Sequence, residues 1–111
     1  MTNYAPALDR VLDALADPTR RAVIRRLGNG PASVGELASA FPMALPSFLR
    51  HIRALEGSGL IRTRKSGRVR TCTLERDRLA VIDGWLAEQR AIWESRTDRL
   101  ETFLQDAKDD R

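Results

Sequence analysis

The sequence has few of the residue types that build covalent cross-links, metal sites and bulky cores. Its 111 residues contain one cysteine, Cys72, and one histidine, His51, and only 5% of them are aromatic. A single thiol excludes an intramolecular disulfide, and a metal site built from cysteines would need ligands from another chain. With so few aromatic rings, the core has to consist mainly of Leu, Ile, Val and Ala side chains.

Long apolar runs and catalytic motifs are also missing. No apolar run approaches the roughly 20 residues that span a bilayer, and Met1–Asp9 does not resemble a secretory signal, so we expect a cytoplasmic protein without membrane contact. No nucleophile stands beside a second histidine and no glycine-rich phosphate loop occurs, so we expect no enzyme. The length fits a single domain, residues 1–111.

Basic charge is plentiful and unevenly distributed. The formal net charge is +4, and the part up to Glu75 is net positive whereas the part from Arg76 onward is net negative. Between residues 50 and 70 a single acidic residue, Glu56, stands among the basic residues Arg50, Arg53, Arg62, Arg64, Lys65, Arg68 and Arg70. Like charges at this density favour a polyanionic partner. The alternative is a charged surface that contacts only water and keeps the protein in solution.

Three helices are predicted in the first part of the chain. Apolar residues recur at helical spacing over about 5–16. Asp17 and Pro18 start a second helix, since Asp17 can cap it and a proline in the first turn loses no hydrogen bond. That helix ends at the turn residues 28–31. A Ser-x-x-Glu capping box then predicts a short third helix at 34–40.

A fourth helix follows the proline-rich turn at 41–46. It starts near Pro46, and Gly57 and Gly59 close it. The side chains that share its apolar face are Phe48, Ile52 and Leu55.

The rest of the chain is predicted to form a hairpin and a long helix. The β-branched, alternating runs 60–64 and 69–74 indicate two strands, joined by a basic tip at 65–68. Helical spacing returns at 79–107, which would be roughly 43 Å long and exceeds the diameter of a small domain. We expect residues 108–111 to be disordered.

A helix, a short turn, a second helix and a basic hairpin form the winged helix-turn-helix arrangement. The predicted class is therefore mainly α with a small β-hairpin (α+β), with a DNA-binding core at about 18–75. Double-stranded DNA is the expected partner, with the fourth helix in the major groove and the hairpin tip at the backbone or minor groove. The expected contact residues are Ser47, Leu49, Arg50, His51, Arg53, Arg64, Lys65, Arg68 and Arg70. Arg50 and Arg53 either read guanine edges or bind phosphates.

The remaining candidate residues have simple structural interpretations. His51 is expected to pack or to contact a phosphate, since no catalytic partner accompanies it. Cys72 fits a buried small apolar residue, with a redox sensor as the alternative.

Apolar residues on the first and last helices outnumber what one small core can cover. This surplus predicts a homodimer in which the two helices form the interface, called the dimer seam. Alternatively, Trp85 and Trp93 line an apolar effector pocket at this seam. The seam residues would be Leu8, Leu12, Leu15, Trp85, Ile92, Trp93, Leu100, Phe103 and Leu104.

Several of these motifs together resemble the ArsR/SmtB-type transcriptional repressors. The run Leu15-Ala16-Asp17-Pro18-Thr19-Arg20-Arg21 is similar to that family's second helix. Further similar runs lie at 36–38, 43–46, 50–56, 59–61 and 64–68. The resemblance spans about Leu8 to Leu104. It implies a homodimeric repressor that dimerises through its first and last helices, binds an inverted repeat in its own promoter and is released by an effector.

The sequence departs from the resembled family in two places. The third helix has no thiol, and the last helix offers Asp77, Asp83 and Glu88 but no histidine, so we expect no metal, no cofactor and an unknown, non-metal effector. Leu49 stands where a small hydroxyl residue is usual, and it can touch a thymine methyl but donates no hydrogen bond. The alternative function is an architectural DNA-binding or protein-interaction module without a regulatory role.

Overall fold

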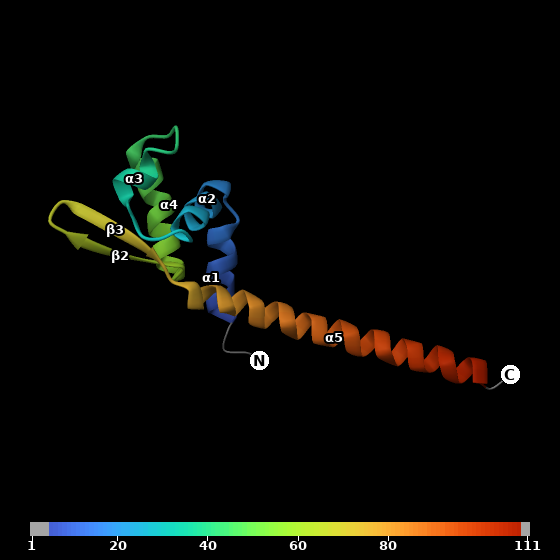
Figure 1. Cartoon of the computed structure of the whole chain (residues 1–111). Helices are drawn as coiled ribbons and strands as arrows, with labels where there is room; N and C mark the ends of the chain where they lie inside the picture. The colour runs from blue at the N-terminus through green and yellow to red at the C-terminus, as the bar shows by residue number, and fades with distance from the viewer. Residues whose placement is uncertain (1–4, 110–111) are drawn as a thin grey trace.

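The computed structural model of the chain describes residues 5–109 (Figure 1). The elements in order are α1 (Ala5–Leu15), α2 (Pro18–Leu27), β1 (Ala32–Ser33), α3 (Val34–Ala38), α4 (Leu45–Ser58), β2 (Ile61–Ser66), β3 (Val69–Leu74) and α5 (Arg76–Asp109). A mainly helical chain with a small antiparallel sheet confirms the predicted fold class. Within the described residues, no helix is long and apolar enough to cross a bilayer.

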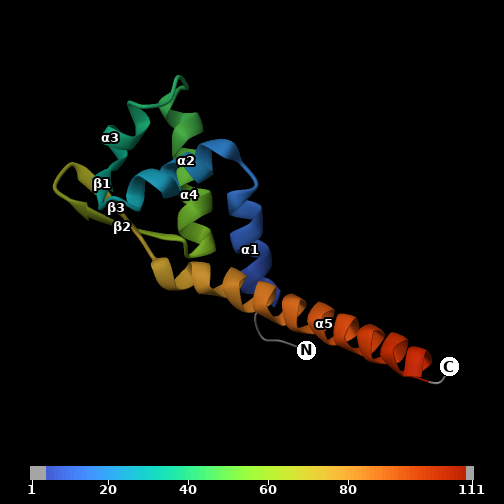
Figure 2. The same cartoon turned by 45° about the vertical axis from the view of Figure 1, so that its right-hand side comes forward.

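The hydrophobic core lies where α1, α2 and α4 pack together, with α3 and the sheet along one side (Figures 1 and 2). The predicted inward face of α4 is confirmed, since Phe48 and Leu55 are 0% exposed and Ile52 is 4% exposed. The other fully or nearly fully buried apolar residues are Leu8, Val11, Ala14, Val23, Leu27, Ala32, Leu37, Leu60, Ile61 and Cys72. The core is thus mainly aliphatic around the buried ring of Phe48, in keeping with the scarcity of aromatic residues.

Side-chain caps and one glycine set the ends of the helices. The Asp17 carboxylate accepts a hydrogen bond from the Arg20 N–H at 3.1 Å and caps α2, while Ser33 caps α3. Gly59 ends α4 with a φ of +83°, a conformation that favours glycine, and a Cβ at this position would displace the Arg78 guanidinium. Gly57 does not close the helix, because α4 continues to Ser58.

The sheet contains a strand that the sequence did not predict. The strand order is β1-β3-β2, and β1 pairs with β3 so that Ala32 lies opposite Cys72. The strands of the hairpin also extend further than predicted, because Lys65 and Ser66 belong to β2. Only Gly67 and Arg68 then remain for the turn, with Gly67 at a φ of +63°.

The last helix is longer than predicted at both ends. It starts at Arg76 rather than at 79, and it continues to Asp109, so Lys108 and Asp109 are helical rather than disordered. The expectation for Asp110 and Arg111 lies outside the described residues. The start of α5 packs against α1, and its second half extends away from the other elements (Figures 1 and 2), which gives the molecule a longest dimension of 77 Å.

Candidate nucleic-acid interface

The outer face of α4 carries two free arginines. Arg50 and Arg53 are exposed, whereas Ser47 and Leu49 are half-buried beside them. The side chains of Arg50 and Arg53 form no ion pair with another described residue. Both guanidinium groups are therefore available to a ligand outside the chain, and both project from a helix whose opposite face is fixed in the core.

His51 belongs to a cluster that joins α4 to the start of α2. Its Nδ1 accepts a hydrogen bond from Arg20 Nε at 3.2 Å and lies 3.6 Å from the Asp17 carboxylate. Burial alone would raise the pKa of Asp17. The hydrogen bond from the Arg20 N–H, and the attraction of the His51 ring when it is protonated, outweigh this effect and hold the pKa of Asp17 below its usual value. His51 is thus hydrogen-bonded within the protein, and Arg20 is a further residue of the candidate nucleic-acid interface that the sequence did not predict.

The four basic residues predicted for the hairpin do not share one face. Residues that lie opposite each other in an antiparallel pair point to the same side of the sheet. Lys65 lies opposite Arg70, on the same side as the buried Cys72, whereas Arg64 lies opposite Thr71 on the other side. Arg68 stands in the turn itself. The hairpin therefore presents cations on both of its faces and at its tip.

Arg70 is exposed, but its side chain is hydrogen-bonded to a neighbouring strand. Its Nη1 donates a hydrogen bond to Thr63 Oγ1 at 2.8 Å, and the Thr63 hydroxyl in turn donates to the Glu56 carboxylate of α4. This chain of bonds connects the hairpin to the C-terminal half of α4. Sequence reasoning did not find Thr63 and Glu56, because only the strand register brings them beside Arg70.

Cys72 is fully buried on the inner face of β3. Burial raises the pKa of the thiol and the Glu56 charge raises it further, against a smaller opposing effect of Arg70. Little thiolate forms at neutral pH in such a place, and the thiolate is the reactive form. These features fit the interpretation of Cys72 as a small core residue.

The residues predicted for a dimer seam fall into two groups. Leu8 is 8% exposed and Leu15 packs against the core, so a single protomer already covers most of both side chains. The exposed group consists of Leu12, Trp85, Ile92, Trp93, Leu100, Phe103 and Leu104. Six of these seven lie on α5 and form a stripe that no other part of the described chain covers.

No group of three or more His, Cys, Asp or Glu side chains gathers as possible metal ligands within residues 5–109. The Asp77, Asp83 and Glu88 carboxylates of α5 thus form no metal-binding cluster with other described residues.

Comparison with known proteins agrees with this architecture. A family model described as a helix-turn-helix domain matches residues 15–64. The HTH-type transcriptional regulator Rv2034 of Mycobacterium tuberculosis (strain ATCC 25618 / H37Rv) is 40% identical over 74 residues, which cover 67% of this chain and 69% of that protein. The crystal structure of an ArsR family transcriptional regulator, RHA00566, is 57% identical and has a TM-score of 0.82, covering 86% of this chain and 98% of its own. The chain belongs to the ArsR family of transcriptional regulators.

This membership confirms the family resemblance of the sequence motifs. The matched helix-turn-helix model includes α2, α3 and α4 and most of β2, so the exposed face of α4 is part of the DNA-binding domain of this ArsR-family regulator. A second relative, the transcriptional repressor SdpR of Bacillus subtilis (strain 168), is 30% identical over 60 residues, which cover 54% of this chain and 67% of that protein.

Proposed function

We propose that this ArsR-family regulator is a homodimeric repressor that binds an inverted-repeat operator and is released by a non-metal effector. The observation that carries the proposal is the placement of Arg50 and Arg53, free and exposed on a helix anchored in the core, beside a hairpin with cations at its tip. A major groove admits a helix of this kind, and the hairpin can follow the adjacent backbone.

The proposed contacts divide into reading and positioning groups. Arg50, Arg53, Ser47 and Leu49 lie on α4, where a rigid backbone can hold a side chain at a base edge. Arg64, Lys65 and Arg68 lie on the hairpin and neutralise phosphates, which adds affinity without sequence information. His51 and Arg70 complete the proposed contact residues, and hydrogen bonds with Arg20 and Thr63 orient their side chains.

The uncovered apolar stripe supports a homodimer. Trp85 and Leu104 are about 28 Å apart along α5 at 1.5 Å per residue, and the exposed side chains between them form a long apolar surface. Soluble monomers rarely leave so much contiguous apolar surface in water. A twofold pair would cover it and would also present two copies of α4 to the two halves of an inverted repeat.

Binding to operator DNA tests this function. A duplex carrying the inverted repeat from the promoter of the protein's own gene should bind roughly a thousandfold or more tighter than a scrambled duplex at the same salt concentration. Transcription from that promoter in a purified system should fall when the protein is added. Equal affinity for the two duplexes, or unchanged transcription, would contradict a repressor that recognises its own operator.

A further inference from the structure

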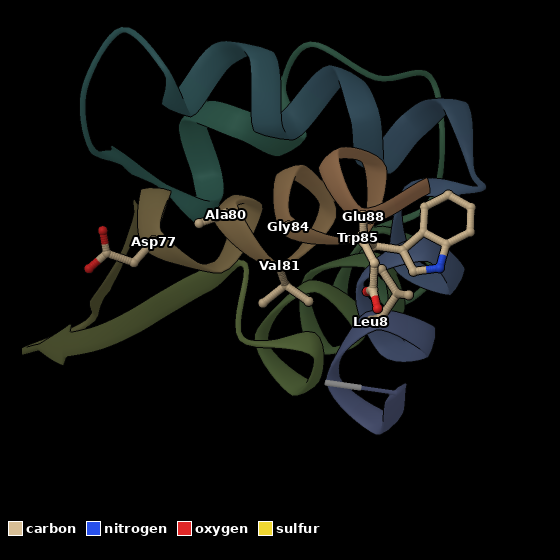
Figure 3. Close-up of a pocket in the computed structure, with 7 residues that line it drawn as sticks. All are labelled: Leu8, Asp77, Ala80, Val81, Gly84, Trp85 and Glu88. Atoms are coloured by element: carbon tan, nitrogen blue, oxygen red, sulfur yellow. The ribbon is translucent and has the colours of Figure 1, made fainter. Parts of the chain in front are cut away.

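The structure contains an apolar groove along the first turns of α5 that the DNA-binding surface does not use. It has a volume of about 310 Å³ and is lined by Leu8 of α1 and by Asp77, Ala80, Val81, Gly84, Trp85 and Glu88 of α5 (Figure 3). The volume lies at the lower end of the range for small-molecule sites. The floor is apolar, and Gly84 leaves it open, because a Cβ built there would meet no atom within 4 Å.

The charge of this groove is opposite to that of the whole chain. Its charged lining groups are two carboxylates, Asp77 and Glu88, although the chain has a net charge of +4. Arg76 of α5 donates to the Gly28 carbonyl oxygen at 3.1 Å, and Arg78 lies against Gly59 in a neighbouring hollow that shares Asp77 and Val81 with the groove. Neither lining carboxylate forms an ion pair with another described residue. The groove is therefore free to accept a cation.

The two carboxylates have different surroundings. Asp77 lies in the first turn of α5, where a negative charge is stabilised by the helix dipole. Glu88 lies at the other end of the groove with Trp85 and Leu8 (Figure 3). A carboxylate next to an indole and an aliphatic side chain suits a cation with an apolar body, because the indole face attracts positive charge and the aliphatic floor takes the hydrocarbon.

We propose that this α1–α5 groove binds an apolar organic cation, such as an alkylammonium, with its charged end at Glu88 and Trp85 and its hydrocarbon over Val81 and Gly84. Binding of the cation does not depend on the proposed repressor function. Only the expected consequence of binding, release of the protein from DNA, rests on that function. Leu8 and Trp85 line the groove and also belong to the proposed dimer seam, and α1 packs against both α5 and α4. A ligand between α1 and α5 can thus change the spacing of the two α4 helices in a dimer.

Binding is tested first, without DNA. The probe is hexyltrimethylammonium, and Trp85 is the reporter in a Trp93→Phe protein, which then has a single tryptophan. We expect a saturable change in Trp85 fluorescence, while hexanesulfonate and hexan-1-ol, which share the six-carbon chain, bind more weakly. Calorimetry on the unmodified protein should give the same order of affinities.

Three variants locate the site. Glu88→Gln should weaken cation binding about two- to fivefold, as expected for one exposed ionic contact. Glu101→Gln, about 20 Å further along α5, should leave binding unchanged. Gly84→Leu should fill the groove and abolish binding, whereas Gly84→Ala controls for the loss of the glycine. Circular dichroism tests whether each variant is folded, and sedimentation tests whether its assembly has changed.

The results separate this inference from the proposed function. Equal affinities for the cation and hexan-1-ol, or no effect of Glu88→Gln, would overturn the ligand class. If Gly84→Leu shifts the sedimentation coefficient and the probe does not bind the unmodified protein, the groove is occupied by a second copy of the chain. This result too would overturn the inference. Operator release by the probe is then measured on its own. Binding without release contradicts the regulatory consequence, whereas a failure of operator binding in the absence of probe contradicts the proposed function.

Discussion

At the scale of single residues, Asp17 has the clearest energetic role. Its carboxylate caps α2 through the Arg20 N–H and lies 3.6 Å from His51 Nδ1, so one side chain stabilises both a helix end and the contact between α2 and α4. Its pKa is below the usual value of 3.8, because the hydrogen bonds and positive charges around it outweigh the effect of burial.

Replacing Asp17 by alanine should lower the free energy of unfolding by about 0.5–2 kcal/mol at neutral pH, the usual cost of losing such a cap. A carboxylate with a lowered pKa stabilises the folded state above its unfolded-state pKa, and this stabilisation is lost as the pH falls through the folded-state value. The difference from the unmodified protein should therefore shrink below about pH 4. Urea titrations at several pH values measure this difference in unfolding free energy, and replacement of the exposed Asp9 by alanine is the control. A difference that does not depend on pH would contradict the role of the ionised carboxylate as a cap.

Arg50 and Arg68 should have separable effects on DNA binding. Arg68→Ala at the hairpin tip should weaken binding to operator DNA and to scrambled DNA about equally. It should also reduce the salt slope by roughly 0.9 for each phosphate that the arginine no longer neutralises, and a symmetric dimer has two such sites. Arg50→Ala should cost about 1–3 kcal/mol per half-site and relax preference at one base position if Arg50 reads a base.

Salt titrations of both variants on both duplexes distinguish the two roles, with the exposed Arg90→Ala of α5 as the control. A loss of sequence preference in Arg68→Ala, with preference intact in Arg50→Ala, would reverse our assignment of reading to α4 and positioning to the hairpin.

At the scale of elements, α5 differs from the other helices in how its apolar face is covered. Leu79 and Ile82 at its start pack against the core, while Trp93, Leu100 and Phe103 in its second half are 57–68% exposed. The first half is thus part of the domain, and the second half has no covering element in the described chain. A partner helix is the simplest way to cover it.

Replacing Leu100 by glutamine should weaken the proposed dimer, because the substitution places a polar group in the apolar stripe of the seam. Sedimentation at micromolar concentration should give twice the chain mass of 12.5 kDa for the unmodified protein and a shift toward the monomer for the variant. Asp98→Asn, about 160° around the helix from Leu100, is the matched control and should not change the assembly. A monomeric unmodified protein would refute the seam.

At the scale of the whole molecule, two regions differ in both charge and shape. The helix-turn-helix and hairpin carry the excess of positive charge, whereas the part from Arg76 onward is net negative and forms the projecting helix. Arg76 at the start of α5 donates to the carbonyl oxygen of Gly28, just after α2, and Glu75, just before α5, forms an ion pair with Arg62 of β2 at 3.3 Å. A change at α5 therefore has direct physical connections to α2 and β2.

Metal ions should not control this regulator. Adding stoichiometric zinc, cadmium or arsenite should leave operator affinity unchanged, because the thiol of Cys72 is buried in the core and α5 offers carboxylates without histidine. Fluorescence anisotropy with and without each metal measures the effect, and a chelator added afterwards is the control. A tight stoichiometric complex that releases DNA would show that other ligands had been overlooked.

Local signals in the sequence were enough to predict most elements. Apolar spacing and caps act within a few residues, so α1, α2, α4 and the hairpin could be located from runs such as Asp17-Pro18 and from the apolar residues Phe48, Ile52 and Leu55. The order of these elements and the density of arginines between 50 and 70 then predicted the winged helix-turn-helix class, and the resemblance of motif runs such as residues 15–21 indicated the family.

Tertiary structure alone decided which of these residues remain free and which are held within the protein. The Arg20–His51 bond joins residues 31 positions apart, and the pairing of β1 with β3 brings Ala32 opposite Cys72, so no local pattern signals either. Strand register places Arg70 beside Thr63 and leaves Arg64 on the other face. The groove of Leu8, Gly84 and Glu88 likewise exists only because α1 and α5 pack against each other, since Leu8 and the lining residues of α5 are far apart in the sequence.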